Sequence, residues 1–188
     1  MEKTLLIFGI AIFILGVSRN IFFTFFKIKL FLAYEGSYKI FGIASTLAGL
    51  GGAGATILYG KMVDRFGGVK IFAVGSLVYM SFYFILAFSR NPIILTIPWI
   101  VPVGSLISIP AVSLTAELSE EKARGRAQGV VSGAQRIAGI GTVIGGLVAD
   151  YIGALEDIQQ LNLIFLGLTP FPLLSVIITL ILLKVEKK

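Results

Sequence analysis

The sequence contains no cysteine and no histidine among its 188 residues. The lack of cysteine excludes disulfides, thiolate metal sites and cysteine nucleophiles, and the lack of histidine removes the usual general base of enzymes. Charged residues make up only 14% of the chain, so few carboxylates remain from which a hydrolytic or metal site could be built. We therefore expect a protein that is not an enzyme and that holds no metal ion or cofactor.

Polar residues are also too few to cover a soluble globule, since 56% of the chain is hydrophobic and the mean hydropathy is +0.95. A helix needs about 20 apolar residues to cross a hydrocarbon core of about 30 Å, so a chain of this length holds about six spans. We predict an all-α, multi-pass integral membrane protein in the lipid bilayer. The expected spans are residues 4–26, 40–60, 69–89, 93–116, 126–149 and 161–183. The first lacks a small-residue cleavage site and is expected to be a retained helix and not a signal peptide.

The net charge of +6 follows from membrane topology and does not indicate a nucleic-acid partner. Most basic residues fall on one side of the six-span arrangement: Lys3, Lys61, Arg65, Lys70, Lys122, Arg124, Arg126, Lys184, Lys187 and Lys188. The opposite side holds fewer: Lys27, Lys29, Lys39 and Arg90. Because basic loops are retained in the cytoplasm, both termini are predicted to be cytoplasmic, and we expect the plasma membrane as the location.

A short polar segment, GKMVDRFGGVK at residues 60–70, separates the second and third apolar runs. It resembles the cytoplasmic loop signature of the major facilitator superfamily of membrane transporters. In that family a glycine, three residues, an Asp-Arg pair, one residue and another glycine join the second and third helices of a six-helix half. The matching positions here are Gly60, Asp64, Arg65 and Gly67. The basic residues that usually follow directly are replaced by Gly68 and Val69.

The stretch from residue 117 to residue 153 resembles the same family. Its halves often show an acidic end to the fourth helix, here Glu117, and an Arg-Gly pair that opens the fifth, here Arg124 and Gly125. The glycine-rich fifth helix then closes with Asp150 and Gly153. The resemblance thus covers nearly the whole chain, which has the length of half a twelve-helix transporter.

An internal echo supports this resemblance. The spacing of Gly60, Asp64 and Gly67 at the end of the second run recurs in Gly146, Asp150 and Gly153 at the end of the fifth. Two three-helix repeats, at about residues 1–90 and 91–188, would make these runs equivalent, and an odd helix number inverts the second repeat. The alternative is that glycine and aspartate commonly end helices.

The resemblance implies a single six-helix domain, residues 1–188, that moves a small-molecule solute by alternating access. Because two halves normally enclose the pathway, it implies a homodimer or a heterodimer with a second half. It also implies a conformational latch, in which Asp64 accepts hydrogen bonds from a helix N-terminus of the partner half and Arg65 pairs with Glu117. Gly60 and Gly67 would allow a tight turn, and Asp150 would be the repeat equivalent of Asp64. The alternative is a basic cytoplasmic loop with a helix stop.

Two arginines lie inside the predicted spans. Arg136 is ten residues beyond Arg126, or about 15 Å along a helix, and belongs to a stripe of mostly small residues: Gly125, Gly129, Ser132, Arg136, Gly139 and Val143. A guanidinium at that depth must face protein or water, so we predict that Arg136 points inward, toward the small residues. There it either contacts an anionic ligand in the central cavity or bonds a neighbouring helix. Arg19, with Asn20 beside it, either lines the central cavity of the transporter or extends its charged end to the outer membrane interface.

We therefore predict Arg19, Asn20 and Arg136 as substrate contacts. The membrane interior lacks the acids or histidines that usually relay protons, so a uniporter or exchanger of anions fits better than proton coupling. Two alternatives stay open. In the first, the chain is a membrane scaffold or regulatory subunit that does not transport. In the second, it is the remnant of a split transporter gene.

Overall fold

The computed structural model describes residues 2–153 and 158–186, with side chains for residues 4–153 and 161–181. These residues form helices and no strand, and six helical spans are long and apolar enough to cross a membrane. The prediction of an all-α protein with six membrane helices is confirmed.

The first three spans are single helices, and each of the last three is built from shorter pieces. The continuous helices are α1 (Glu2–Ala33), α2 (Tyr38–Phe66) and α3 (Gly68–Phe88). The fourth span consists of α4 (Pro92–Ile100) and α5 (Val103–Glu117). The fifth consists of a short 3-10 helix (Glu121–Ala123), α6 (Arg124–Ile137) and α7 (Ile140–Ile152), and the sixth of α8 (Ile158–Leu168) and α9 (Pro170–Glu186).

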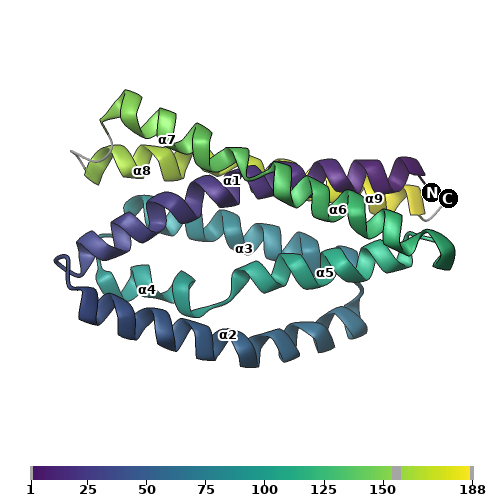
Figure 1. Ribbon diagram of the computed structural model, residues 1–188, viewed down its shortest axis with the longest axis horizontal. Helices are drawn as coiled ribbons and strands as arrows, with labels where there is room; N and C mark the ends of the chain where they lie inside the picture. The colour runs from purple at the N-terminus through teal and green to yellow at the C-terminus, as the bar shows by residue number, and fades with distance from the viewer. Residues whose placement is uncertain (1, 154–157, 187–188) are drawn as a thin grey trace.

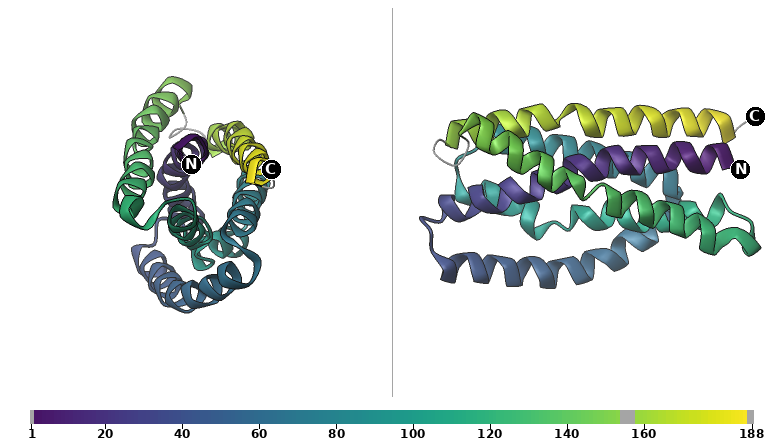
Figure 2. Two further views of the ribbon diagram at one scale, coloured as in Figure 1. Left: turned by 90° about the vertical axis from the view of Figure 1, so that its right-hand side faces the viewer. Right: turned by 45° about the horizontal axis from the view of Figure 1, so that its top comes forward.

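All helices run roughly along the long axis of the molecule, and both termini lie at the same end (Figure 1). We call this the terminal end and the other the distal end. Helix α1 packs against α6, α7, α8 and α9, while α3 packs against α5, α8 and α9. Helix α2 lies at the edge of the bundle, where it contacts mainly α4 and α5 (Figures 1 and 2). Only Ala44, Tyr59 and Val63 of its 29 residues are buried.

The three breaks have identifiable chemical causes. Pro102 directly precedes α5 and Pro170 begins α9, and proline has no N–H to continue the hydrogen-bond ladder of the preceding helix. The break between α6 and α7 is tighter, because Gly139 N donates to Arg136 O and Thr142 N to Gly139 O, each at 3.0 Å. These are the i to i+3 bonds of a 3-10 turn, which inside a longer helix often marks a hinge.

Two predicted helix ends were wrong. The first helix was expected to stop at residue 26 but continues to Ala33, because the stem of Lys29 is buried in the bundle instead of ending the span. The second was expected to stop at residue 60 but continues to Phe66. Asp64 and Arg65 therefore lie in the last turn of α2, and the turn itself is Gly67, at a φ of 86° that favours glycine.

Close contacts between helix backbones depend on two glycines. A Cβ added to Gly75 of α3 would lie 2.7 Å from the carbonyl oxygen of Leu106 in α5, and one added to Gly141 of α7 would collide with the carbonyl oxygen of Val17 in α1. Small residues let helices approach in a membrane, where lipid supplies no hydrophobic drive for association. These crossings hold the fourth and fifth spans against α3 and α1 at about mid-length.

Candidate functional site

Arg19 and Arg136 both lie at the middle of their spans. Arg19 is 14 residues from the nearer end of α1, at Ala33, which corresponds to about 21 Å along the helix. Arg136 is 15 residues from the nearer end of the fifth span, at Glu121, or about 22 Å. Because α1, at 32 residues, is longer than the roughly 20 residues that cross a hydrocarbon core, the alternative in which Arg19 extends to the outer interface stays open.

Asn20 joins α1 to the kink beside Arg136. Its side-chain amide donates to the carbonyl oxygen of Gly16 at 2.8 Å and to that of Ala138 at 3.2 Å. Ala138 is the C-cap residue that directly follows α6. The side-chain amide of Asn20 thus bonds to α1 and to the end of α6, and its role as a substrate contact stays a prediction.

The stripe that contains Arg136 lies on the outside of this six-helix bundle. The Arg136 side chain is exposed, and Ser132 and Gly139 on either side of it are half-buried. The buried face of α6 and α7 consists instead of small or β-branched residues that turn toward α1: Ala127, Val131, Ala138, Gly141, Gly145 and Ala149. Arg136 therefore does not point into the core of its own chain, and the prediction that it points inward is wrong for this six-helix bundle.

A buried hydroxyl group lies close to Arg19 on the inner side of α1. Ser18 Oγ donates to the carbonyl oxygen of Leu15 at 3.0 Å and lies 3.2 Å from the hydroxyl of Tyr83 in α3. Tyr79, one turn earlier in α3, is also buried. Sequence reasoning missed this cluster, although hydroxyl residues inside an apolar run are the signal that would have found it.

A cavity of about 310 Å³ lies beside the break in the fourth span, between α1, α2 and α3. We call it the break pocket, and its lining residues include Phe22, Phe23, Tyr79, Phe82, Trp99 and Gly104. Irregular backbone at membrane depth is tolerated where it is buried in protein or lines a cavity, as it does here. The polar groups near the middle of the bundle are thus arranged around α1, on both of its sides.

Comparison of the sequence with known protein families assigns this six-span chain to a family. The sequence model of the Major Facilitator Superfamily matches residues 8–188. The chain belongs to the major facilitator superfamily. No curated protein matches the chain in a sequence search. As a member of this superfamily the chain is a membrane transporter, and the predicted resemblance is confirmed over nearly its full length.

The signature residues of this superfamily member lie at the terminal end. Asp64 and Arg65 are exposed, and the Arg65 guanidinium lies over the ring of Phe66, 5.2 Å from its centroid. Glu117, also exposed, accepts a hydrogen bond from Ser113 Oγ at 2.8 Å within α5. Arg65 and Glu117 thus each contact a neighbour on their own helix, and the pairing of Arg65 with Glu117 stays a prediction.

Asp150 lies at the distal end, opposite Asp64. It is exposed in the last turn of α7, which Gly153 ends in the left-handed conformation at a φ of 63°. The two copies of the glycine and aspartate spacing therefore end helices at opposite ends of the bundle. The division into two inverted repeats is compatible with this placement and stays a prediction.

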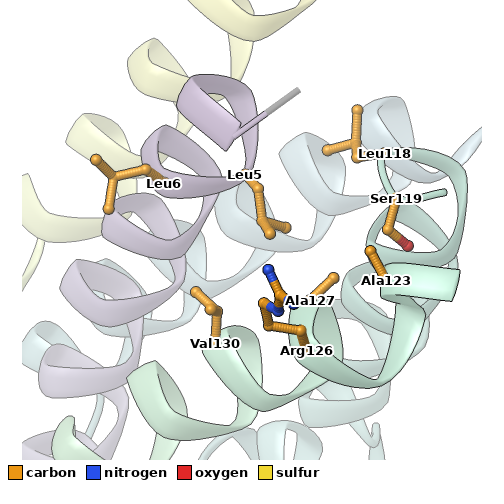
Figure 3. A pocket seen from close by; sticks show the side chains of 8 residues that line it. All are labelled: Leu5, Leu6, Leu118, Ser119, Ala123, Arg126, Ala127 and Val130. Carbon is orange, nitrogen blue, oxygen red and sulfur yellow. The ribbon is translucent and has the colours of Figure 1, made fainter.

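A second cavity of this superfamily member, of about 240 Å³, lies at the terminal end between α1, α5 and α6. Figure 3 shows its lining, which is apolar apart from Ser119 and from Arg126, whose side chain turns toward Leu5 of α1. Leu5 precedes Arg19 by 14 residues, so this cavity lies about 21 Å along α1 from the mid-span arginines. It is separate from the group of polar residues at the middle of the bundle.

Proposed function

We propose that this superfamily member is one half of a transporter that moves a small anionic solute by alternating access. The other half is a second copy of the chain or a separate six-helix chain. The observation that carries the proposal is the position of Arg136, exposed on the outside of the bundle at the middle of its span. A guanidinium facing lipid at that depth costs at least about 2.5 kcal/mol, so this face meets water or protein.

The charge inside the spans favours an anion. Arg19 and Arg136 lie at mid-span, whereas none of the ten acidic residues of the sequence falls in the middle of a predicted or observed span. Two positive charges without counter-ions would attract a negatively charged solute and strengthen its binding in a site of low dielectric. The same lack of intramembrane carboxylates argues against a proton relay through this half.

Two faces of the bundle differ in a way that supports pairing with a second half. The outer faces of α3 and α9 expose large apolar side chains such as Leu77, Phe84, Ile177 and Leu180, as expected for contact with lipid. Helix α2 and the α6–α7 span also expose large apolar side chains, such as Leu50 and Leu147, but they carry in addition glycines with open space around them: Gly42, Gly49, Gly54, Gly60, Gly125, Gly129 and Gly146. Such small residues allow close approach of another helix.

In this arrangement the terminal-end residues act as a latch between halves. Asp64 is exposed at the end of α2, where its carboxylate can accept hydrogen bonds from a helix N-terminus of the second half. Arg65 and Glu117 supply an ion pair that forms when the terminal end closes, and Asp150 serves the distal end. Gly60 and Gly67 allow the close contact and the turn that this requires.

Single cysteines test whether the face of Arg136 is aqueous. The chain has no cysteine of its own, so each introduced thiol is the only one. In native membranes we expect Arg19→Cys and Arg136→Cys to react with a charged, water-soluble thiol reagent and Ile177→Cys on α9, which is exposed to lipid, to stay unreactive. If the first two stay silent while the denatured samples react, there is no aqueous pathway and a scaffold or regulatory subunit becomes the better interpretation.

The mass of the complex tests the pairing. Native mass spectrometry of the protein extracted gently from its membrane should give twice the chain mass of 20.2 kDa, or one copy with a different chain of similar size. Either result is expected from the proposal, because a six-helix half encloses a pathway only with a second half. A monomer that persists in several mild detergents would contradict it and favour a remnant of a split transporter.

A further inference from the structure

We propose that the break pocket binds the ring of a small aromatic carboxylate and that Arg19 attracts its negative charge. This inference rests on the proposed function, since it names the class of solute that the transporter carries. It adds a site on the inner side of α1 that the sequence did not indicate. The argument has three parts: why the pocket exists, which groups in it lack partners, and which charges lie nearby.

The pocket exists because two of its walls, on α2 and on the fourth span, lack large side chains. On α2 the lining residues are Ser45, Ala48 and Gly49, whose side chains are small. On the fourth span the helix is interrupted at Val101 and Pro102, and Gly104 presents no side chain. The remaining walls are aromatic, with Phe22 and Phe23 from α1 and Phe82 from α3. A flat apolar body fits between such walls because aromatic rings prefer stacked or edge-to-face contact.

Two residues that line the pocket each carry a buried polar group for which the described part of the chain supplies no hydrogen-bond partner. The Tyr79 hydroxyl and the Trp99 Nε1 are buried without one. Tyr79 is 1% exposed, and its hydroxyl faces Gly104, where an added Cβ would lie 3.8 Å from it. Buried polar groups are nearly always paired in native proteins, so each exception calls for a ligand, an ion or a water. Because the indole N–H can only donate and the phenol can donate, the missing partner is an acceptor.

The pocket is held in shape before any ligand arrives. Tyr79 packs edge-on against Phe22, with ring centroids 6.2 Å apart, and lies 5.9 Å from Tyr83. Trp99 contacts Phe26 of α1 at 5.5 Å and Phe41 of α2 at 6.1 Å. A site whose rotamers are fixed by packing loses little entropy when it binds.

Two positively charged residues of α1 lie near these donors. Arg19 directly follows Ser18, which contacts the Tyr83 hydroxyl one turn from Tyr79, and Lys27 Nζ lies over the Trp99 ring, 5.9 Å from its centroid. The nearest acidic residues along the chain lie at the helix ends, so these cations favour an anionic acceptor over a neutral one. An aromatic carboxylate supplies both the flat apolar body and the charged acceptor. The cavity volume of about 310 Å³ is at the lower end for ligand sites and suits a single ring.

Benzoate is the probe that tests this inference, because Trp99 is the only tryptophan of the chain and lines the pocket. The full-length protein, purified in its native assembly, is titrated with benzoate while tryptophan fluorescence is followed. We expect a saturable change, and we expect Tyr79→Phe to raise the dissociation constant about tenfold, the loss typical of one hydrogen bond to a charged group. Tyr83→Phe is the matched control, because its hydroxyl faces Ser18 and it is not part of the pocket lining.

Further probes separate the ring from the charge. Acetate lacks the ring and benzyl alcohol lacks the charge, and we expect both to bind at least tenfold more weakly than benzoate. Equal binding of benzoate by the wild type and Tyr79→Phe would overturn the inference, since the hydroxyl would then be served by water. No saturable change with benzoate would overturn it as well.

Uptake into proteoliposomes distinguishes this inference from the proposed function. Uptake of acetate or another ring-free anion that proceeds with no fluorescence change on benzoate supports anion transport and overturns the aromatic site. Benzoate binding that depends on Tyr79, without uptake of any anion, supports the pocket and contradicts transport.

Discussion

Arg136→Gln is expected to lower the uptake of a transported anion about 10- to 100-fold in reconstituted proteoliposomes. A hydrogen bond to a charged group contributes about 1.5–3 kcal/mol, and glutamine keeps a polar side chain of similar reach but loses the charge. Because Arg136 is exposed on the face proposed to meet the second half, the substitution leaves the packing of its own bundle unchanged. The measurement is initial uptake with a panel of labelled small anions.

The matched control is Arg124→Gln, an exposed arginine in the first turn of the same helix at the terminal end. We expect it to retain most of the wild-type uptake. Arg136→Lys should lie between wild type and Arg136→Gln, since lysine restores the charge without the planar fork of guanidinium donors. Unchanged uptake and substrate preference in Arg136→Gln would show that Arg136 has no role in binding the solute.

Lys29→Met is expected to destabilise the folded protein by about 2–3 kcal/mol. Lys29 is fully buried near the distal end of α1, where its ammonium donates to the carbonyl oxygen of Leu86 and to Asn162 Oδ1 at 2.6 Å and lies 5.3 Å from the ring centroid of Phe165. It therefore joins α1 to the end of α3 and the start of α8. Methionine fills similar space but leaves both oxygen acceptors without a donor, which costs the desolvation of buried polar groups. Unfolding of the purified protein by increasing mole fractions of SDS measures the difference.

Two further variants show whether this contact is the cause. Lys27→Met removes an exposed lysine two residues earlier and should change stability by less than about 0.5 kcal/mol. Lys29→Met combined with Asn162→Leu should recover part of the lost stability, because replacing both partners leaves fewer unpaired groups than replacing one. Equal stability of Lys29→Met and wild type would mean that the ammonium adds nothing to the cohesion of these three helices.

The hydrophobic pattern was sufficient to predict the class and the number of spans. Each span contains an apolar run of membrane length, and the signature around Asp64 identified the family that the match over residues 8–188 confirms. Helix ends were harder to predict, since Lys27 and Lys29 indicated that the first helix stops at residue 26. The tertiary structure overrides that reading by burying Lys29 with two hydrogen-bond acceptors that lie far away in the sequence.

The arrangement of the polar residues was only partly predictable. Arg19 and Arg136 stood out because a charge inside an apolar run is rare. The engagement of Asn20 with Ala138 and the unpaired hydroxyl of Tyr79 depend on contacts between separate spans, which a single sequence does not reveal. The exposed face of Arg136 was also not evident, because periodicity groups residues into stripes but does not say which stripe faces the core.

The breaks in the last three spans lie at comparable depths, about 14 to 21 Å from the distal ends of these spans. They divide the second half of the chain into two tiers, with α4, α7 and α8 in one and α5, α6 and α9 in the other, beside the unbroken α1, α2 and α3. Any tilting of one tier is absorbed at three short joints, so the hydrogen-bond ladder within each short helix stays intact. At the sixth span the Thr169 hydroxyl already donates to the carbonyl oxygen of Leu166 at 2.7 Å. The molecule therefore combines three continuous helices with three interrupted spans. Bending of these spans at their breaks would disrupt few backbone hydrogen bonds.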